Sequence, residues 1–331
     1  MTAPRLDVLA IGNAIVDVIA DADDVFLAQQ SLTKGSMRLI DEAEAVRLYG
    51  VMGPGREISG GSAGNTAAGL ASFGLKAGFI GQVASDELGD IYRHDVESLG
   101  VDFLIAARDD VGATARSLIL VTPDAQRTMN TFLGAAQRLE ARDIDPAAVA
   151  DAAILYLEGY LWDPAEPRAA MEAAIAAARG AGRKVAFTLS DTFCVDRHRD
   201  GFWALINMGK IDILFANEAE LAVMTGSDDL DTGLAALAPK VATLVVTRSE
   251  HGAVAVRGDE RASVSAEPIE RLVDTTGAGD LFAAGFLAGE ARGLGLEASL
   301  KLGAIAAAEV IQHYGARPEK NLKALAGGLL G

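Results

Sequence analysis

The chain contains little cysteine and little histidine. Its one cysteine, Cys194, cannot form a disulfide within the chain. This is typical of a reducing compartment, so we expect a cytoplasmic protein. The four histidines are scattered along the sequence without the spacing of metal ligands. The sequence therefore gives no support to a zinc site.

Positive charge is also scarce, because 29 Lys and Arg stand against 46 Asp and Glu, for a formal net charge of −17. Nucleic acid and anionic membranes are therefore poor partners, and any bound phosphate must be held by local groups. No run of about 18 uncharged apolar residues occurs, so we expect no membrane span. The apolar segment 8–16 lacks a small-residue cleavage site, and we expect the first strand there rather than a signal peptide.

The composition and pattern predict an α/β protein. Of the 331 residues 50% are hydrophobic, and the mean hydropathy of +0.23 excludes a disordered chain. Short β-branched runs alternate with alanine-rich helical stretches, which predicts a mostly parallel sheet covered by helices on both faces, in a single domain over 1–331. The expected strands are 8–11, 78–83, 153–157, 185–189, 211–215, 244–247 and 253–256. The expected helices are 63–73, 87–99, 165–179, 218–224, 280–291 and 296–313.

Two segments, at about 14–40 and 101–132, break this alternation. Residues 117–122 alternate in the manner of a strand, and a crossover topology has little use for such strands inside the main sheet. We expect the two segments to form a small antiparallel sheet that covers the site as a lid.

The sequence Asp-Thr-Thr-Gly-Ala-Gly-Asp at 274–280, which precedes an apolar helix, is the sharpest motif. Main-chain amides of Gly277, Ala278 and Gly279 at a helix start form an anion hole that needs no lysine. We expect these amides to keep the Asp280 carboxylate ionised, so that it can accept a proton from a substrate hydroxyl. The alternative is a glycine turn with Asp280 as a plain helix cap.

Other nucleotide-binding motifs do not match. A dinucleotide fingerprint needs a small residue where this chain has Phe282, and too few residues follow for the rest of that fold. The P-loop motif is absent, since Gly209-Lys210 is followed by Ile211.

Two further features favour sugar binding. A second glycine cluster at 59–65 contains Gly61 and Asn65, which permit close approach of a ligand and offer a donor and an acceptor. The alternative is a flexible loop that leads into a helix. Asp17 places one carboxylate on an otherwise apolar strand face, where paired hydroxyls of a sugar would supply two donors, unless that face is solvated.

Two polar features are ambiguous. Asn217 and Glu220 follow a strand in the pattern of a capping box. Alternatively, Glu220 orders water around Mg²⁺ near the phosphates. Arg127, beside a turn in the lid, could close over a transferring phosphoryl group or be solvated.

The motifs at 274–280, 60–65 and 217–220, in this order and spacing, closely resemble the ribokinase-like (PfkB) family of sugar and nucleoside kinases over nearly the whole chain. This resemblance implies a three-layer α/β/α core with a β-sheet lid. The sequences at 11–14 and 31–35, with Asp17, and Leu189-Ser190 with Phe193 are most similar to the adenosine kinase branch. In that branch, a glutamine often stands where this chain has Met37, and an aromatic residue where it has Leu161.

The resemblance also implies roles for individual residues. Asp280 resembles the catalytic base, Gly277, Ala278 and Gly279 the anion hole, and Arg127 the lid arginine near the transferred phosphoryl group. The implied substrate-binding residues are Asn13, Asp17, Gly61, Asn65 and Phe193. The implied ATP-binding residues are Asn217, Glu220, Thr247, Thr276, Gly277 and Gly279, with Glu220 contacting Mg²⁺ through water.

We therefore expect a kinase that uses ATP and Mg²⁺, with a monovalent cation such as K⁺ as a further candidate, to phosphorylate the 5′-hydroxyl of a ribose-containing substrate such as adenosine. The first alternative is a ribokinase-like or fructokinase-like enzyme that acts on a free sugar. The second is a nucleoside-binding sensor without catalysis. We expect small-molecule partners only, with neither nucleic acid nor membrane, and a monomer or homodimer.

Overall fold

The structure, a computed structural model, describes residues 4–124 and 126–330. Within them, the larger of two sheets has nine strands in the order β14-β13-β12-β11-β10-β9-β1-β5-β6. Neighbouring strands are parallel except β12–β13 and β13–β14, which are antiparallel. The strands are β1 (Leu6–Ile11), β5 (Ala77–Ile80), β6 (Val101–Phe103), β9 (Ala152–Glu158), β10 (Lys184–Thr188), β11 (Ile213–Asn217), β12 (Thr243–Thr247), β13 (Ala253–Arg257) and β14 (Glu260–Val264).

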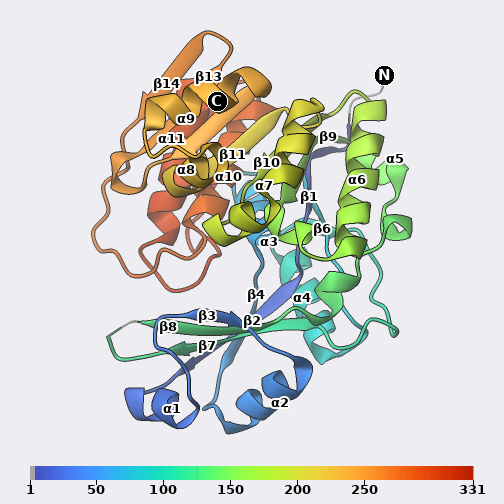
Figure 1. The fold of residues 1–331 in the computed structure, drawn as a ribbon, viewed down its shortest axis with the longest axis vertical. Coiled ribbons are helices and arrows are strands. Elements are labelled where there is room, and N and C mark those ends of the chain that lie inside the picture. The colour runs from blue at the N-terminus through green and yellow to red at the C-terminus, as the bar shows by residue number, and fades with distance from the viewer. Residues whose placement is uncertain (1–3, 125, 331) are drawn as a thin grey trace.

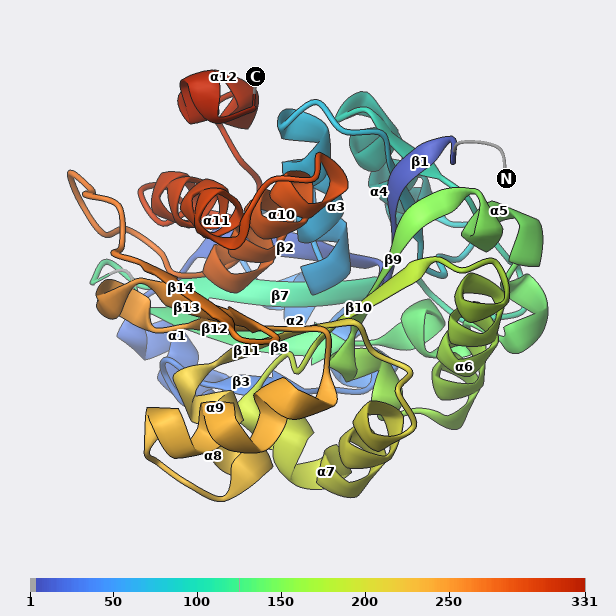
Figure 2. The ribbon, with the colours of Figure 1, turned by 90° about the horizontal axis from the view of Figure 1, so that it is seen from above.

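Helices cover both faces of this sheet, as Figure 2 shows from above, so the expected three-layer α/β/α arrangement is confirmed. One layer holds α3 (Ser62–Ser72), α4 (Glu87–Ser98), α10 (Ala278–Ala291), α11 (Leu296–Val310) and α12 (Leu322–Ala326). The other holds α5 (Pro146–Ala150), α6 (Ala165–Gly180), α7 (Thr192–Asn207), α8 (Glu218–Thr225) and α9 (Leu230–Leu237). Short 3-10 helices span Gly134–Arg138, Ala141–Asp143, Gly159–Trp162, Ala238–Lys240, Ser249–His251 and Gly327–Leu330.

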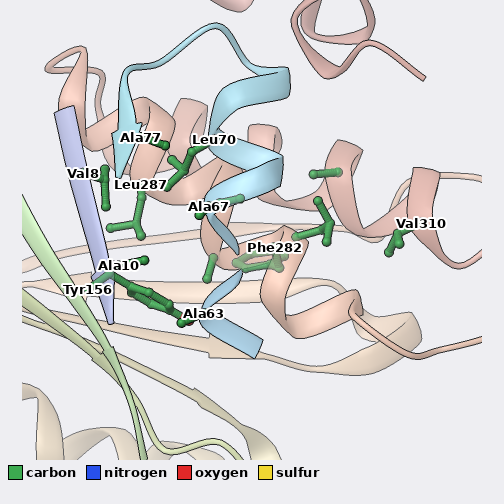
Figure 3. Close-up of a cluster of buried hydrophobic side chains, with 14 of the residues drawn as sticks. Val8, Ala10, Ala63, Ala67, Leu70, Ala77, Tyr156, Phe282, Leu287 and Val310 are labelled. Carbon is green, nitrogen blue, oxygen red and sulfur yellow. The ribbon is translucent and has the colours of Figure 1, made fainter. Parts of the chain in front are cut away.

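Strand β1 separates two hydrophobic cores, because alternate side chains of a strand point to opposite faces of the sheet. Val8 and Ala10 face the core under α3 and α10, whereas Leu9 and Ile11 face the core under α6 and α7. Figure 3 shows the first core, where side chains of α3 and α10 lie beside Val8 and Ala10. This packing fixes the start of α10 next to the start of α3.

Helices α10 and α11 pack closely because α10 is rich in small residues. A side chain at Gly285 would come within 2.3 Å of the main-chain oxygen of Leu302 on α11. Glycine at this position therefore lets the two helices approach almost backbone to backbone. As a result, the N-terminus of α10 is held rigidly at the carboxyl edge of the large sheet.

The smaller sheet lies apart from the larger one, with α1 (Asp24–Gln29) and α2 (Glu42–Val51) on its far side (Figure 1). Its strand order is β3-β8-β7-β2-β4. The pairs β2–β4 and β7–β8 are antiparallel, as expected, but β2–β7 and β3–β8 are parallel. The strands are β2 (Ile15–Asp21), β3 (Met37–Leu39), β4 (Arg56–Ser59), β7 (Ala115–Val121) and β8 (Arg127–Phe132).

The small sheet differs from the expected lid segments at two places. β4 belongs to it although it lies outside 14–40 and 101–132, because its sequence Arg-Glu-Ile-Ser has too few apolar residues to show a strand pattern. β6, at the start of 101–132, instead pairs with β5 in the large sheet. None of the described helices is long and apolar enough to cross a membrane.

Candidate active site

A cavity of about 920 Å³ lies where the small sheet meets the carboxyl edge of the large sheet. The ends of parallel strands meet at this edge, as is usual for ligand sites in open α/β sheets. Every candidate residue named above except Arg127 lines the cavity, namely Asn13, Asp17, Gly61, Asn65, Phe193, Asn217, Glu220, Thr247, Thr276, Gly277, Ala278, Gly279 and Asp280. Residues from distant parts of the chain are therefore brought to one site.

The start of α10 presents main-chain amides to this cavity. Gly277 caps the helix with φ +80°, and a side chain there would come within 2.6 Å of Ala316. Among the described residues, the amides of Gly277, Gly279 and Asp280 have no hydrogen-bond acceptor. The amide of Ala278, also predicted for the anion hole, instead donates to the main-chain oxygen of Thr275 at 3.2 Å. At Gly279 an added side chain would point into open space. Free amides at a helix start, open to a cavity, fit a phosphate group.

The carboxylate of Asp280 is held by two side chains of α3. Oδ1 accepts a hydrogen bond from Ser62 Oγ at 2.6 Å, and Oδ2 accepts one from Asn65 Nδ2 at 2.8 Å. Burial raises the pKa of Asp280, although these two bonds and the nearby charge of Arg317 lower it. The main-chain amides that we expected to keep this carboxylate ionised do not bond to it among the described residues, whereas Ser62 and Asn65 do. The raised pKa makes Asp280 a stronger base.

Asn65, which we expected to bind substrate hydroxyls, also binds Asp280 within the protein. Its Nδ2 serves Asp280, while its Oδ1 is buried and has no hydrogen-bond partner among the described residues. Because a buried acceptor without a donor is costly, this oxygen is suited to accept a ligand hydroxyl from the cavity. Ser62, the other partner of Asp280, was not predicted as a site residue.

The carboxylate of Asp17 on β2 has no hydrogen-bond donor among the described residues. It is partly buried and makes no hydrogen bond or ion pair within the described part of the chain. Burial raises its pKa to about 7, although the charges of Arg317 and Arg127 lower it. Two adjacent hydroxyls would supply the missing donors.

Glu158, at the end of β9, is a site residue to which the sequence gave no specific role, although it lies at an expected strand end, where ligands bind. Its fully buried carboxylate accepts hydrogen bonds from the main-chain amide of Asn13 at 2.8 Å, from Asn13 Nδ2 at 2.9 Å and from the amide of Ala63 at 2.7 Å. Burial raises its pKa to about 7. It joins the loop after β1 to the start of α3. An acidic residue directly after a buried strand was the available signal.

Asn217 and Glu220 form the expected capping box at the start of α8 and also line the cavity. Both Glu220 oxygens accept hydrogen bonds from Asn217, at 2.9 Å and 2.7 Å. Burial raises the pKa of Glu220 to about 7. No group of three metal-ligating side chains occurs among the described residues. These residues fit Mg²⁺ only as a water-mediated partner, which is compatible with its preference for phosphate and water ligands.

Arg127, at the start of β8, does not line the cavity and instead contacts the loop before α10. Its guanidinium is 2.7 Å from Asp274 Oδ2, donates to Thr276 Oγ1 at 3.1 Å and lies over the ring of Tyr314. The ion pair with Asp274 is almost completely buried. Arg127 is therefore not solvated, and in this structure it ties the small sheet to the anion-hole loop.

The inner face of the small sheet changes from apolar to polar. In register, Met37 on β3 faces Met129 on β8, whereas Ser117 on β7 faces Asp17 on β2. Both pairs line the cavity. The sheet thus offers an apolar surface at one end of the cavity and hydroxyls with a carboxylate at the other.

Two aromatic side chains also line the cavity. Phe193 lines it and is 73% exposed. Leu161, which the resemblance aligns with an aromatic position, is buried in the core instead. Its neighbour Tyr160 lines the cavity, so the aromatic surface is shifted by one residue rather than absent.

Comparisons with known proteins show chains that are similar in sequence and fold. The crystal structure of a probable sugar kinase from Rhizobium etli CFN 42 is 48% identical, with a TM-score of 0.92, and covers 98% of this chain and 99% of that one. The crystal structure of adenosine kinase from Sinorhizobium meliloti is also 48% identical, with a TM-score of 0.90 and coverage of 97% and 98%. Adenosine kinase from Saccharomyces cerevisiae is 28% identical over 337 residues, 95% of this chain and 96% of that protein.

A family model described as "pfkB family carbohydrate kinase" matches residues 51–322, which is most of the chain. The matched part contains the glycine cluster at 59–65, the pair Asn217 and Glu220, and the motif at 274–280. The chain therefore belongs to the pfkB family of carbohydrate kinases, and it is a phosphotransferase that acts on an alcohol group.

Proposed function

We propose that this kinase transfers the γ-phosphoryl group of ATP to the 5′-hydroxyl of a ribonucleoside, with adenosine as the preferred acceptor. The proposal of a nucleoside rests on one observation, which is that the cavity-lining side chains of the small sheet change from apolar to polar. The hydroxyls of a ribose fit beside Asp17, and a purine fits against Met37, Met129 and the aromatic surface of Tyr160 and Phe193.

The proposed chemistry begins at Asp280. Its carboxylate, oriented by Ser62 and Asn65, takes the proton of the 5′-hydroxyl. The hydroxyl oxygen forms a bond to the γ-phosphorus, the bond between that phosphorus and the bridging oxygen breaks, and ADP leaves. Because the transition state for phosphoryl transfer is loose, positioning matters more than basicity.

The start of α10 supplies the second part of the proposed mechanism. The free amides of Gly277, Gly279 and Asp280 stabilise charge on the transferring group, aided by the helix dipole. When bound, Mg²⁺ would neutralise charge on the phosphates, and Glu220 would hold its water shell. A K⁺ requirement, a cytoplasmic location and the oligomeric state stay predictions from the sequence.

The names of two similar proteins support adenosine, since the kinases from S. meliloti and yeast are adenosine kinases that match over nearly their whole length. A free-sugar kinase is the second candidate, favoured by the equal identity to the probable sugar kinase from R. etli. A sensor without catalysis is disfavoured because Asp280 keeps both of its orienting partners.

A screen of acceptors tests the proposal. ADP release would be measured with ATP, Mg²⁺ and one acceptor at a time from a panel of adenosine, other nucleosides, ribose and fructose. We expect adenosine to give the highest kcat/KM, because a free sugar leaves the apolar end of the cavity empty. Faster turnover of ribose or fructose would establish the sugar kinase instead. Thermal stabilisation by adenosine without any ADP release would establish the sensor.

A further inference from the structure

The residues that line the cavity are mostly acidic among the charged ones, and arginines that do not line it offset part of this negative charge. Six acidic residues line the cavity, namely Asp17, Glu158, Asp163, Asp191, Glu220 and Asp280. Arg197 is the one arginine or lysine that lines it within the described residues, and it is paired with Asp163 at 2.8 Å. The remaining positive charge near Asp17 and Asp280 comes from arginines outside the wall, of which Arg317 affects both carboxylates.

Arg317 binds main-chain oxygens rather than carboxylates. Its Nε donates to the oxygen of Ser59 at 2.9 Å, and its two terminal nitrogens donate to the oxygens of Gly64 and Gly60. It also donates to Ser59 Oγ at 3.2 Å. No ion-pair partner lies within 4 Å of it among residues 4–124 and 126–330. Its charge is therefore not neutralised locally by a salt bridge.

The three oxygens belong to the turn where the chain passes from the small sheet to the large one. Ser59 ends β4, and Gly64 lies in the first turn of α3. The same turn of α3 carries Ser62 and Asn65, the two partners of Asp280. The side chain of Tyr92 also donates to the oxygen of Gly60, at 3.2 Å. Arg317 thus braces the segment that orients Asp280.

The loop that carries Arg317 is itself anchored on both sides. The amide of Gly315 donates to Asp274 Oδ2 at 3.2 Å. The amides of Glu319 and Lys320 donate to the buried Glu309 Oε1 at 3.1 Å and 2.9 Å. Because its backbone is fixed before and after Arg317, the guanidinium cannot easily follow a displaced partner.

We propose that Arg317 is a positioning residue for the phosphoryl transfer, which braces the Ser59–Gly64 turn and keeps a positive charge behind Asp17 and Asp280. This inference rests on the proposed role of Asp280. The charged and titratable groups that act on the guanidinium are Asp17, Asp280 and Tyr92, while Arg127 and Asp274 also act on Asp17. Loss of the charge favours the protonated carboxyls.

The test compares pH profiles of kcat/KM for adenosine in full-length Arg317→Met, Arg317→Lys and Arg292→Met. Arg292 is the matched control, because its guanidinium also donates to main-chain oxygens, those of Phe73 and Leu330, away from the cavity. In Arg317→Met we expect the acidic limb of the kcat/KM profile to move upward by about one pH unit, so that kcat/KM at pH 6 falls roughly tenfold. Arg317→Lys should keep the limb near its original place while kcat falls. Arg292→Met should change only thermal stability.

An acidic limb and a kcat in Arg317→Met that coincide with those of Arg292→Met would overturn the inference. If Arg317→Met does not fold, Arg317→Lys gives the answer. A lowered kcat with an unshifted acidic limb would support Arg317 as a positioning residue, and an unchanged kcat would overturn it. Loss of activity in Asp280→Asn, together with a limb and a kcat in Arg317→Met that match those of Arg292→Met, would overturn the role of Arg317 alone. Full activity in Asp280→Asn would instead overturn the proposed function.

Discussion

Replacement of Asp280 by asparagine is expected to lower kcat by about 10²- to 10⁴-fold, the usual contribution of a general base. Asparagine keeps the size of the side chain but cannot accept the proton of the 5′-hydroxyl. The amides at the start of α10 are main-chain groups, so ADP binding should be unchanged. The measurement is steady-state turnover of adenosine and ATP beside ADP titration by calorimetry.

The matched control for this variant is Asp229→Asn. Asp229 also lies at a helix start, where its exposed carboxylate accepts hydrogen bonds from Thr232, but it does not line the cavity. Its variant should lose a little stability and no turnover. Turnover of Asp280→Asn close to that of Asp229→Asn would show that Asp280 has no catalytic role. The alternative of a plain helix cap is already wrong, because Gly277 caps α10 and the Asp280 carboxylate bonds to Ser62 and Asn65.

Asp17→Asn is expected to lower kcat/KM for adenosine by about 10²-fold, because two hydrogen bonds from ligand hydroxyls to a carboxylate become weaker bonds to an amide. The effect should depend on pH. Burial raises the pKa of Asp17 from 3.8 to about 7, so below pH 7 the ligand must displace a proton to bind. The affinity of the unaltered protein for adenosine should rise about tenfold per pH unit toward pH 7 and level off above it. In Asp17→Asn this pH dependence of the affinity should be lost.

The stability of the free protein should show the opposite trend. Because the pKa of Asp17 is raised on folding, this side chain binds more protons in the folded protein than in the unfolded chain between about pH 4 and 7. The contribution of Asp17 to the free energy of unfolding therefore falls as the pH rises through this range, and Asp17→Asn should lose it. The control is Asp21→Asn, an exposed position at the end of the same strand and outside the cavity. Equal adenosine affinities of the two variants at pH 8 would contradict the role of Asp17.

The sequence was most informative where function depends on main-chain geometry. The motif at 274–280 needs glycines at a helix start, and the structure places Gly277 at positive φ directly before α10. Polar residues that follow buried strands, such as Asn13, Asn217 and Thr247, could be predicted to meet because parallel strands end at one edge. These signals are local, so they are visible in a single sequence.

Contacts between distant side chains could not be predicted in this way. Ser62 and Asp280 lie 218 positions apart, and Arg317 reaches a turn 253 to 258 positions earlier. The first contact arises from the packing of α3 against α10, and the second from the loop after α11, which lies beside the start of α3. No local pattern encodes either arrangement. The parallel pairing of β2 with β7 also depends on packing, since the alternation within a strand is the same for either direction. Tyr160 was missed because a 3-10 turn after β9 sets which side chain enters the cavity.

The most direct test of the proposed mechanism is a crystal structure of the protein with adenosine, Mg²⁺ and a non-hydrolysable ATP analogue. We expect γ-phosphate oxygens to accept hydrogen bonds from the amides of Gly277 and Gly279, with the 5′-oxygen beside the Asp280 carboxylate. Phosphates bound elsewhere in the cavity, with those amides facing water, would contradict it.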